Sequence, residues 1–278
     1  MAKVYFPGYK GFKCLAGSCP MNCCKVFRIS FFNWEAEQFG RRADWNDIDG
    51  NGHDIREFLE KDDSGWYCKS RDGACTFFDH GCSLCGVQLR HGAGSMPSVC
   101  RTYPRIITRY DDRAEYGLDP CCPVVAHMMH DWKIGELICE EGLWEPRDEA
   151  ALRRRDALAL LADADVPLQE CLVRLKEMYS VSAAVPHVGV SGKTLDYARR
   201  FLAFMLWSYL LPYDGIGIFE NMMALILDII ACYLEHVEGK SFESDWDMSM
   251  DLSQFLLEYV ERVHFDVEIE GRYVDAKE

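Results

Sequence analysis

Apolar residues recur at helical spacing through the second half of the chain. From Pro167 onward they fall at positions that share one face of a helix, namely Leu168, Cys171, Leu172, Leu175, Met178 and Tyr179. Pro167 suits the first turn of that helix, and Thr194 suits the cap of the next. The pattern predicts helices over residues 149–162, from about 167 to 179, over 195–211, on to about Val237, and over 249–264. The run Pro212-Tyr-Asp-Gly is predicted to end the third of them.

The first half lacks sustained periodicity. Val26–Phe31 alternates apolar and polar residues and predicts a short strand, Asn33 predicts the cap of a helix over 34–41, and Asp54–Lys61 predicts another helix. Residues 65–123 are rich in Cys, Gly and Pro and are hard to fold by apolar burial alone. Ligand bonds to a metal centre can replace missing core.

These patterns predict a fold and a division of the chain. We expect a mainly α protein, with an irregular, cysteine-rich, metal-stapled N-terminal region packed on a C-terminal helical bundle. The predicted boundary separates a cysteine-cluster region at 1–145 from a helical domain at 146–278.

Net charge and the N-terminal sequence narrow the class of protein. A formal charge of −15 disfavours nucleic-acid binding, which needs a basic footprint. The most apolar segments carry charged residues or are short for a membrane span. The first residues lack the apolar core of a secretory signal, so we expect a cytoplasmic protein that does not bind membranes. Cysteines are kept reduced in the cytoplasm, where a dense group of them favours metal binding over disulfides.

The cysteines are distributed unevenly. Eleven of the fourteen lie within the first 122 residues, and Cys139, Cys171 and Cys232 are spread singly beyond them. Thiolates are soft ligands that select zinc, copper(I) or iron–sulfur clusters. The short spacings, Cys14-x4-Cys19-x3-Cys23-Cys24 and Cys82-x2-Cys85, match neither paired zinc motifs nor the standard ferredoxin runs. Spacing alone therefore predicts a metal centre without choosing its type.

The ordered motifs carry a resemblance to a known family. They are Tyr9-Lys-Gly-Phe-Lys-Cys14, Cys19, Cys23-Cys24, Cys75-Thr-Phe-Phe, Cys85-Gly-Val-Gln, Cys100-Arg-Thr-Tyr-Pro-Arg105 and Cys122-Pro123. In this order they resemble the flagellin lysine-N-methylase family, part of a wider group of zinc- or iron-chelating cysteine-cluster proteins. The resemblance covers roughly residues 5–130, and the helical half carries no motif of the family.

The resemblance implies a function and a set of site residues. It implies a [4Fe–4S] protein that transfers methyl groups from S-adenosylmethionine to lysines of flagellin or a similar protein. The implied metal ligands are Cys14, Cys19, Cys23, Cys24, Cys75, Cys85, Cys100 and Cys122, with Cys68, Cys82 and Cys121 as extra cysteines. Arg101, Tyr103 and Arg105 are the candidate cofactor-binding residues, because arginines there can anchor a carboxylate or stabilise a negatively charged centre.

The residues leave several alternatives open. Eight cysteines exceed the four thiolates that saturate one cluster, so one cluster with spare thiols, one cluster plus zinc, or two centres all fit. The runner-up function is a non-enzymatic metal protein, either a zinc-stabilised module or a redox-sensing iron–sulfur protein. No glycine-rich fingerprint follows a strand, so the methyl donor is expected to bind by another route, beside the cluster. The sequence singles out no catalytic base and no oligomeric state.

Overall fold

The computed structural model describes residues 2–140, 145–146, 148–182, 184–209 and 216–263. It is about 49% helical and 15% strand. The fold therefore mixes α and β structure, and the expectation of a mainly α protein was wrong. Some of the strands that the sequence analysis missed pair residues far apart in the chain, such as Val4 with Glu115, and local patterns do not reveal such pairing. Others form short hairpins of two to six residues a strand.

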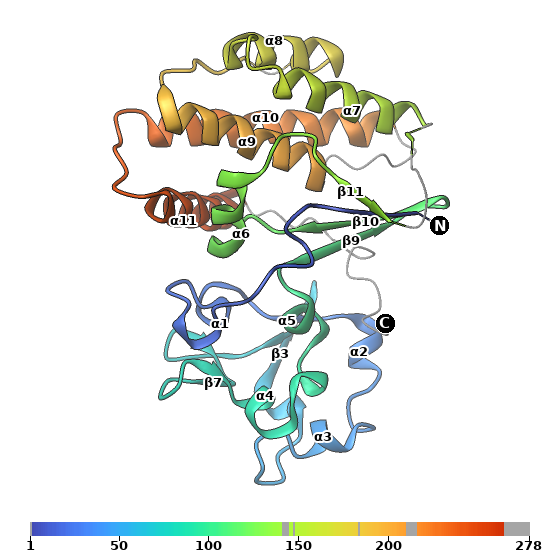
Figure 1. Ribbon diagram of the computed structural model, residues 1–278. Helices are drawn as coiled ribbons and strands as arrows, with labels where there is room; N and C mark the ends of the chain where they lie inside the picture. The colour runs from blue at the N-terminus through green and yellow to red at the C-terminus, as the bar shows by residue number, and fades with distance from the viewer. Residues whose placement is uncertain (1, 141–144, 147, 183, 210–215, 264–278) are drawn as a thin grey trace. The chain divides into compact units, whose positions relative to one another are not determined.

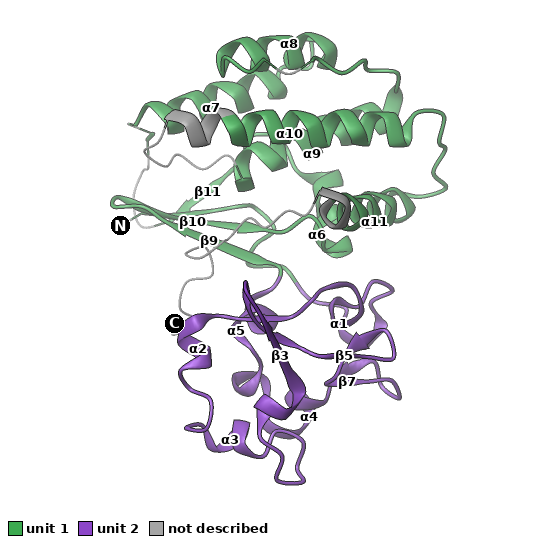
Figure 2. Ribbon diagram, turned by 180° about the vertical axis from the view of Figure 1, so that it is seen from behind, with its two compact units in different colours: residues 1–12, 104–266 green, residues 13–103, 267–278 purple. Residues whose placement is uncertain are grey.

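The chain divides into two compact units (Figure 2). Among the described residues, unit 1 comprises 2–12 and 104–263, and unit 2 comprises 13–103. The units therefore separate at residues 12/13 and 103/104, whereas the sequence pattern predicted a boundary near 145. The reason lies in the N-terminal strand, which pairs with a strand of the second segment of unit 1.

Unit 1 contains a four-stranded sheet of order β11-β1-β10-β9. Its strands are β1 (Ala2–Tyr5), β9 (Arg105–Arg109), β10 (Arg113–Leu118) and β11 (Ile138–Glu140). β1 runs parallel to β10, with Val4 opposite Glu115 and Tyr5 opposite Tyr116, while β9 and β11 are antiparallel to their neighbours. Because side chains alternate along a strand, Val4 and Tyr5 face opposite sides of the sheet.

The helices of unit 1 lie on one side of this sheet (Figure 1). They are α6 (Pro123–Met128), the 3₁₀ turn η4 (Met129–Asp131), α7 (Glu149–Ala162), α8 (Leu168–Met178), α9 (Gly192–Tyr209), α10 (Ile216–Val237) and α11 (Asp245–Val263). The helices predicted in the second half are confirmed, with α9 starting before Thr194 and α11 starting before 249. The predicted stop at Pro212 lies outside the described residues. None of the helices in the described ranges has the length and apolar character needed to cross a bilayer.

Local capping and a shared core hold these helices in place. Asp148 caps α7 by accepting a hydrogen bond from the Ala151 amide at 2.7 Å. The Arg199 guanidinium on α9 donates to the carbonyl of Leu161, in the last turn of α7, and to the carbonyls of Asp163 and Val166 in the segment that follows. The predicted apolar face of α8 is buried at Leu168, Cys171, Leu172 and Leu175.

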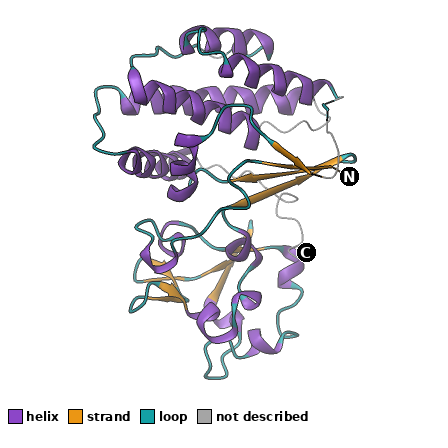
Figure 3. Cartoon of the chain, in the orientation of Figure 1, coloured by secondary structure: helices purple, strands orange, loops and turns teal. Residues whose placement is uncertain are grey.

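Unit 2 is built from short elements (Figure 3). A three-stranded sheet of order β2-β4-β3 joins β2 (Ser30–Phe31), β3 (Leu59–Asp62) and β4 (Gly65–Cys68). Two small hairpins follow, β5 (Ser70–Arg71) with β6 (Ala74–Cys75) and β7 (Phe78–Asp79) with β8 (Leu84–Cys85). The helical turns are η1 (Ala16–Ser18), α1 (Cys23–Val26), α2 (Asn33–Ala36), α3 (Ala43–Asn46), η2 (Ile55–Phe58), α4 (Gly86–His91), η3 (Ala93–Ser95) and α5 (Ser98–Thr102).

Several predicted elements of unit 2 are shorter than expected or of another kind. The strand predicted over Val26–Phe31 forms only at its last two residues, because Val26 ends α1. The helix predicted over Asp54–Lys61 is a 3₁₀ turn that continues directly into β3, and α2 covers only the start of the predicted 34–41 helix. In short segments, strand pairing outweighs a helical pattern of one or two turns.

A compact apolar core supports unit 2. Its buried members are Ile29, Phe31, Trp45, Ile48, Ile55, Leu59, Cys68, Phe77 and Val87. The Trp45 indole is fully buried and donates to the Ser95 carbonyl at 2.8 Å. Cys75, Cys85 and Cys100 pack against this core.

Candidate metal centre

Six cysteines of unit 2 come together from separate elements. Cys23 and Cys24 lie on α1, Cys68 ends β4, Cys75 ends β6, Cys85 ends β8 and Cys100 lies on α5. All are free thiols. The elements are short and turns separate them; Cys68 is part of the apolar core, and Cys75, Cys85 and Cys100 pack against it.

Four of these thiols interact mutually. Burial raises the pKa of Cys100 well above its ordinary value, and charge on Cys75, Cys85 and Cys23 adds to the effect. Burial likewise raises the pKa of Cys85, with contributions from Cys75 and Cys23. Cys23 also acts on Cys75. Every pair among Cys23, Cys75, Cys85 and Cys100 is therefore within electrostatic reach, and we call these four the thiol tetrad.

The other two thiols, Cys24 and Cys68, each form a hydrogen bond with one member of the tetrad and interact electrostatically with two more. A hydrogen bond from Cys24 lowers the pKa of Cys23 to about 7 and raises that of Cys24. The same relation holds between Cys68 and Cys75, where the bond lowers the pKa of Cys75 and raises that of Cys68. The thiolate is the form that binds metals. Within each hydrogen-bonded pair, the thiolate therefore forms more readily on Cys23 than on Cys24, and more readily on Cys75 than on Cys68.

A cavity of about 250 Å³ adjoins these thiols. Cys24, Cys68 and Cys75 line it together with Lys25, Arg28 and Glu60 among others. The Arg28 guanidinium lies 3.6 Å from the centroid of the Tyr67 ring and pairs with Asp62 at 2.7 Å and Glu60 at 3.2 Å. A small molecule therefore has room beside the cysteines, in a cavity lined by both basic and acidic side chains.

The remaining predicted ligands lie apart from the tetrad. Cys14 is exposed, and the Cys19 thiol donates to the Met21 carbonyl at 3.3 Å. Burial raises the pKa of Cys19, with smaller contributions from Cys14 and Cys23, so these two cysteines approach the site on the Cys23 side. Cys122 belongs to unit 1, where it precedes α6 beside Cys121.

The sequence analysis missed Cys68 as a member of this group. A signal for it exists in the Asp72-Gly73 dipeptide, where both residues have positive φ, at 52° and 75°. Asp-Gly is the preferred pair of a type I′ hairpin. Closing that hairpin pairs Ser70 with Cys75, which brings Cys75 back toward Cys68.

The three predicted cofactor-binding residues do not share one environment. Arg101 donates to the Ser98 hydroxyl at 3.2 Å, and the Tyr103 ring packs edge-on against Phe27 at 5.0 Å, both within unit 2. Arg105 lies in unit 1, with its guanidinium over the rings of Tyr9 and Phe12. Each of the three thus has a local packing or hydrogen-bonding role.

The donor chemistry of the tetrad fits a thiolate-bound metal group. Four cysteines are the ligand set of a [4Fe–4S] cluster and also of a structural zinc ion. Within the described ranges, no three His, Cys, Asp or Glu side chains stand in a geometry ready to hold one metal ion. No family model, curated protein or solved structure matches the chain.

Proposed function

We propose that unit 2 binds a [4Fe–4S] cluster through Cys23, Cys75, Cys85 and Cys100. The observation that carries the proposal is the grouping of six mutually interacting thiols, in which the lowered pKa of Cys23 and of Cys75 favours these two over their partners Cys24 and Cys68. One such cluster takes four cysteine thiolates, one for each iron. Cys24 and Cys68 lie against Cys23 and Cys75 as the spare thiols of a single centre.

The reaction we propose is transfer of a methyl group from S-adenosylmethionine to a lysine ε-amine of flagellin or a similar protein. Its support is the resemblance of the ordered cysteine motifs to the flagellin lysine-N-methylase family. Five of the eight cysteines in those motifs belong to the interacting group of six in unit 2, namely Cys23, Cys24, Cys75, Cys85 and Cys100. In this reaction the donor's sulfur–methyl bond breaks, a nitrogen–methyl bond forms, and the amine loses a proton. Because lysine titrates near 10.4, the amine must be deprotonated before it attacks. A reducing cytoplasm, the compartment we propose, keeps the thiols available.

A zinc-stabilised, non-enzymatic module is the second candidate. Four thiolates equally suit structural zinc, and the short elements of unit 2 are typical of domains that a metal staples together. Zinc supplies no sulfide and no colour, so composition separates the two candidates.

The first experiment measures metal and acid-labile sulfide, with an absorption spectrum, on anaerobically purified protein. We expect about four irons and four sulfides per chain. The variant Cys85→Ala removes one tetrad thiol and should abolish most of the cluster. Cys82→Ala is the matched control, because Cys82 is an exposed cysteine of the same β7–β8 hairpin. Zinc without sulfide would overturn the cluster proposal, and equal loss of iron in both variants would overturn the ligand assignment.

The second experiment tests the reaction. Cluster-replete protein is incubated with S-adenosylmethionine and a flagellin, and lysine-containing peptides are analysed by mass spectrometry. We expect mass gains of about 14 Da, one for each methyl group added. A cluster-replete protein that neither binds the donor nor methylates lysine would leave the redox-sensing alternative in place of the methyltransferase.

A further inference from the structure

Three tyrosines gather on the face of the unit 1 sheet that carries Tyr5. Tyr5 and Tyr116 stand opposite each other in register and stack with ring centroids 4.4 Å apart. The turn after β1 returns Tyr9 to them, at 5.7 Å from Tyr5 and 5.4 Å from Tyr116. Tyr5, Tyr9 and Tyr116 are called the tyrosine group below.

Strand alternation explains why these rings share one face. Val4 and Phe6 are buried on the opposite face, where Phe6 packs against Trp132 and Phe204. Tyr5 lies between them in sequence and so points the other way. Tyr9 and Tyr116 are only partly buried. The tyrosine group therefore forms no part of the helix-facing core of unit 1.

Two cations already lie against these rings. The Lys10 ammonium is 4.4 Å from the centroid of Tyr5 and also pairs with the Glu140 carboxylate on β11. The Arg105 guanidinium lies 5.8 Å from the centroid of Tyr9. Aromatic faces attract cations, most strongly where several rings combine with a carboxylate. The Tyr9 hydroxyl is uncharged near neutral pH, as in an ordinary tyrosine, and burial raises its pKa further, to about 12.

Lys10 is held loosely enough to be exchanged. Its side chain is 55% exposed and that of Glu140 is 42% exposed. Exposed ion pairs and cation–π contacts are individually weak. An incoming ammonium group of the same shape can therefore take the place of Lys10 against Tyr5 and Glu140.

We propose that the tyrosine group and Glu140 form a docking site for a lysine side chain of a partner protein, with Lys10 as its internal occupant. The compact ammonium of Lys10, paired with one carboxylate, indicates lysine as the occupant. This inference deepens the proposed function and rests on it only for the identity of the lysine-bearing partner. It assigns a role to Tyr9 and Lys10, which open the first of the ordered motifs.

The test measures binding of a short peptide, acetyl-Ala-Lys-Ala-amide, to the full chain. Tyrosine ring signals are followed by NMR on ring-labelled protein, and Tyr5→Phe, Tyr9→Phe and Tyr116→Phe identify the three signals among 13 tyrosines. The same peptide with norleucine in place of lysine keeps the aliphatic chain and lacks the charge. We expect the lysine peptide to shift the three signals and the norleucine peptide to leave them unmoved.

Two substitutions sharpen the test. Lys10→Met removes the internal competitor and should tighten peptide binding about fivefold, whereas Glu140→Gln should weaken it about fivefold. Lys61→Met is the matched control, because Lys61 also lies over a ring, that of Trp66 at 5.5 Å, but outside the tyrosine group. Equal shifts with both peptides, or no tightening in Lys10→Met, would overturn the docking site.

These results are separable from those for the proposed function. Peptide binding is measured without donor, so zinc in place of the cluster or absence of methyl transfer would refute the function and leave the docking site intact. Unchanged peptide binding in Glu140→Gln, in a preparation that still methylates lysine, would refute the docking site alone.

Discussion

Glu35 shows how one buried side chain positions part of the candidate centre. Only 2% of the residue is exposed, and each carboxylate oxygen accepts a hydrogen bond from a backbone amide. One accepts from the Phe32 amide at 3.1 Å and the other from the Ser98 amide at 2.8 Å. Ser98 begins α5, the turn that carries Cys100. The carboxylate therefore fixes the start of the element that presents a tetrad thiol.

Substitution of Glu35 by Ala should destabilise unit 2 by about 3 kcal/mol, because it leaves buried amides without acceptors. Glu37→Ala, at an exposed position just after α2, should change the stability by no more than about 0.5 kcal/mol. Urea unfolding is followed by ¹⁹F NMR of labelled tryptophans, in which the signal of Trp45 reports the unfolding of unit 2 separately from that of unit 1. A similar, small effect of both substitutions would show that Glu35 does not position α5.

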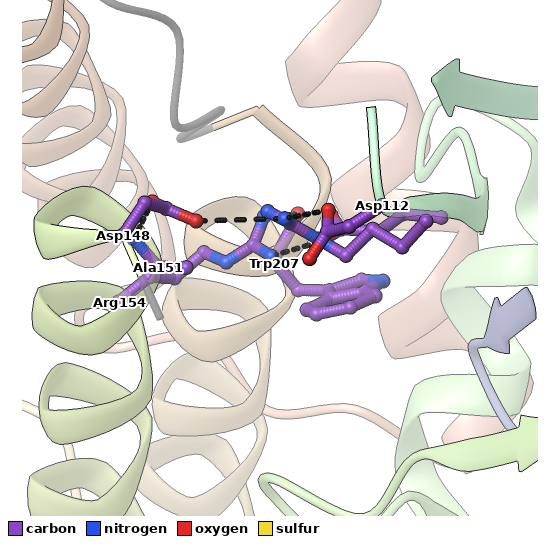
Figure 4. A network of polar contacts seen from close by, with 7 residues as sticks. Asp112, Asp148, Ala151, Arg154 and Trp207 are labelled. Carbon is purple, nitrogen blue, oxygen red and sulfur yellow. Dashed lines mark hydrogen bonds and ion pairs between the residues drawn. The ribbon is translucent and has the colours of Figure 1, made fainter. Parts of the chain in front are cut away.

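At the scale of elements, an ion network joins the sheet of unit 1 to two helices (Figure 4). Glu115 on β10 accepts from Arg113 at 2.7 Å and from Arg154 on α7 at 2.6 Å. Arg154 also donates to the Trp207 carbonyl of α9 at 3.3 Å, and Arg113 pairs with Asp112 at 2.9 Å. The three central side chains are almost fully buried, so the network aligns β10 with α7 and α9 in an environment of low polarity.

Glu115→Gln should destabilise unit 1 by about 3 to 5 kcal/mol, because two buried guanidinium groups would lose the carboxylate between them. The control is Glu149→Gln, which removes an exposed pair with Arg153 on α7 and should cost at most about 0.5 kcal/mol. Urea denaturation followed by circular dichroism of the helices measures both. Equal stability of the two variants would mean that the network contributes no more than a surface ion pair.

At the scale of the whole molecule, the two units differ in what holds them together. Unit 1 has long helices with fully buried apolar faces, including Phe201, Phe204, Ile226 and Ile230. Unit 2 has elements of two to six residues around a small apolar core. A domain of the second kind usually depends on a metal or on disulfides, and the cysteines of unit 2 form no disulfides with one another.

Removal of the proposed metal centre should therefore loosen unit 2 and leave unit 1 folded. Hydrogen–deuterium exchange is measured on the protein as purified anaerobically and after treatment with an iron chelator. We expect faster exchange throughout residues 13–103 and unchanged protection in α7 to α11. Unchanged protection of residues 13–103 after complete metal removal would show that the apolar core alone suffices.

The features that depend on near neighbours could be predicted from the amino-acid order alone. Helix α7 forms over the predicted residues, and the buried face of α8 is the predicted one, because helical periodicity is read within a few residues. The cysteine distribution likewise identified the part of the chain in which the thiols gather.

The features that depend on distant residues are visible only in the folded chain. The pairing of Val4 with Glu115 joins residues more than a hundred positions apart, so the place of β1 in the sheet of unit 1 had no local signal. The choice of thiols was decided in the same way. Turns of the chain bring Cys68 to Cys75 and bring Cys23 near Cys100, while Cys122 folds into unit 1 with the strands that precede it. Spacing along a chain limits which cysteines can meet, but the packing of the elements selects those that do.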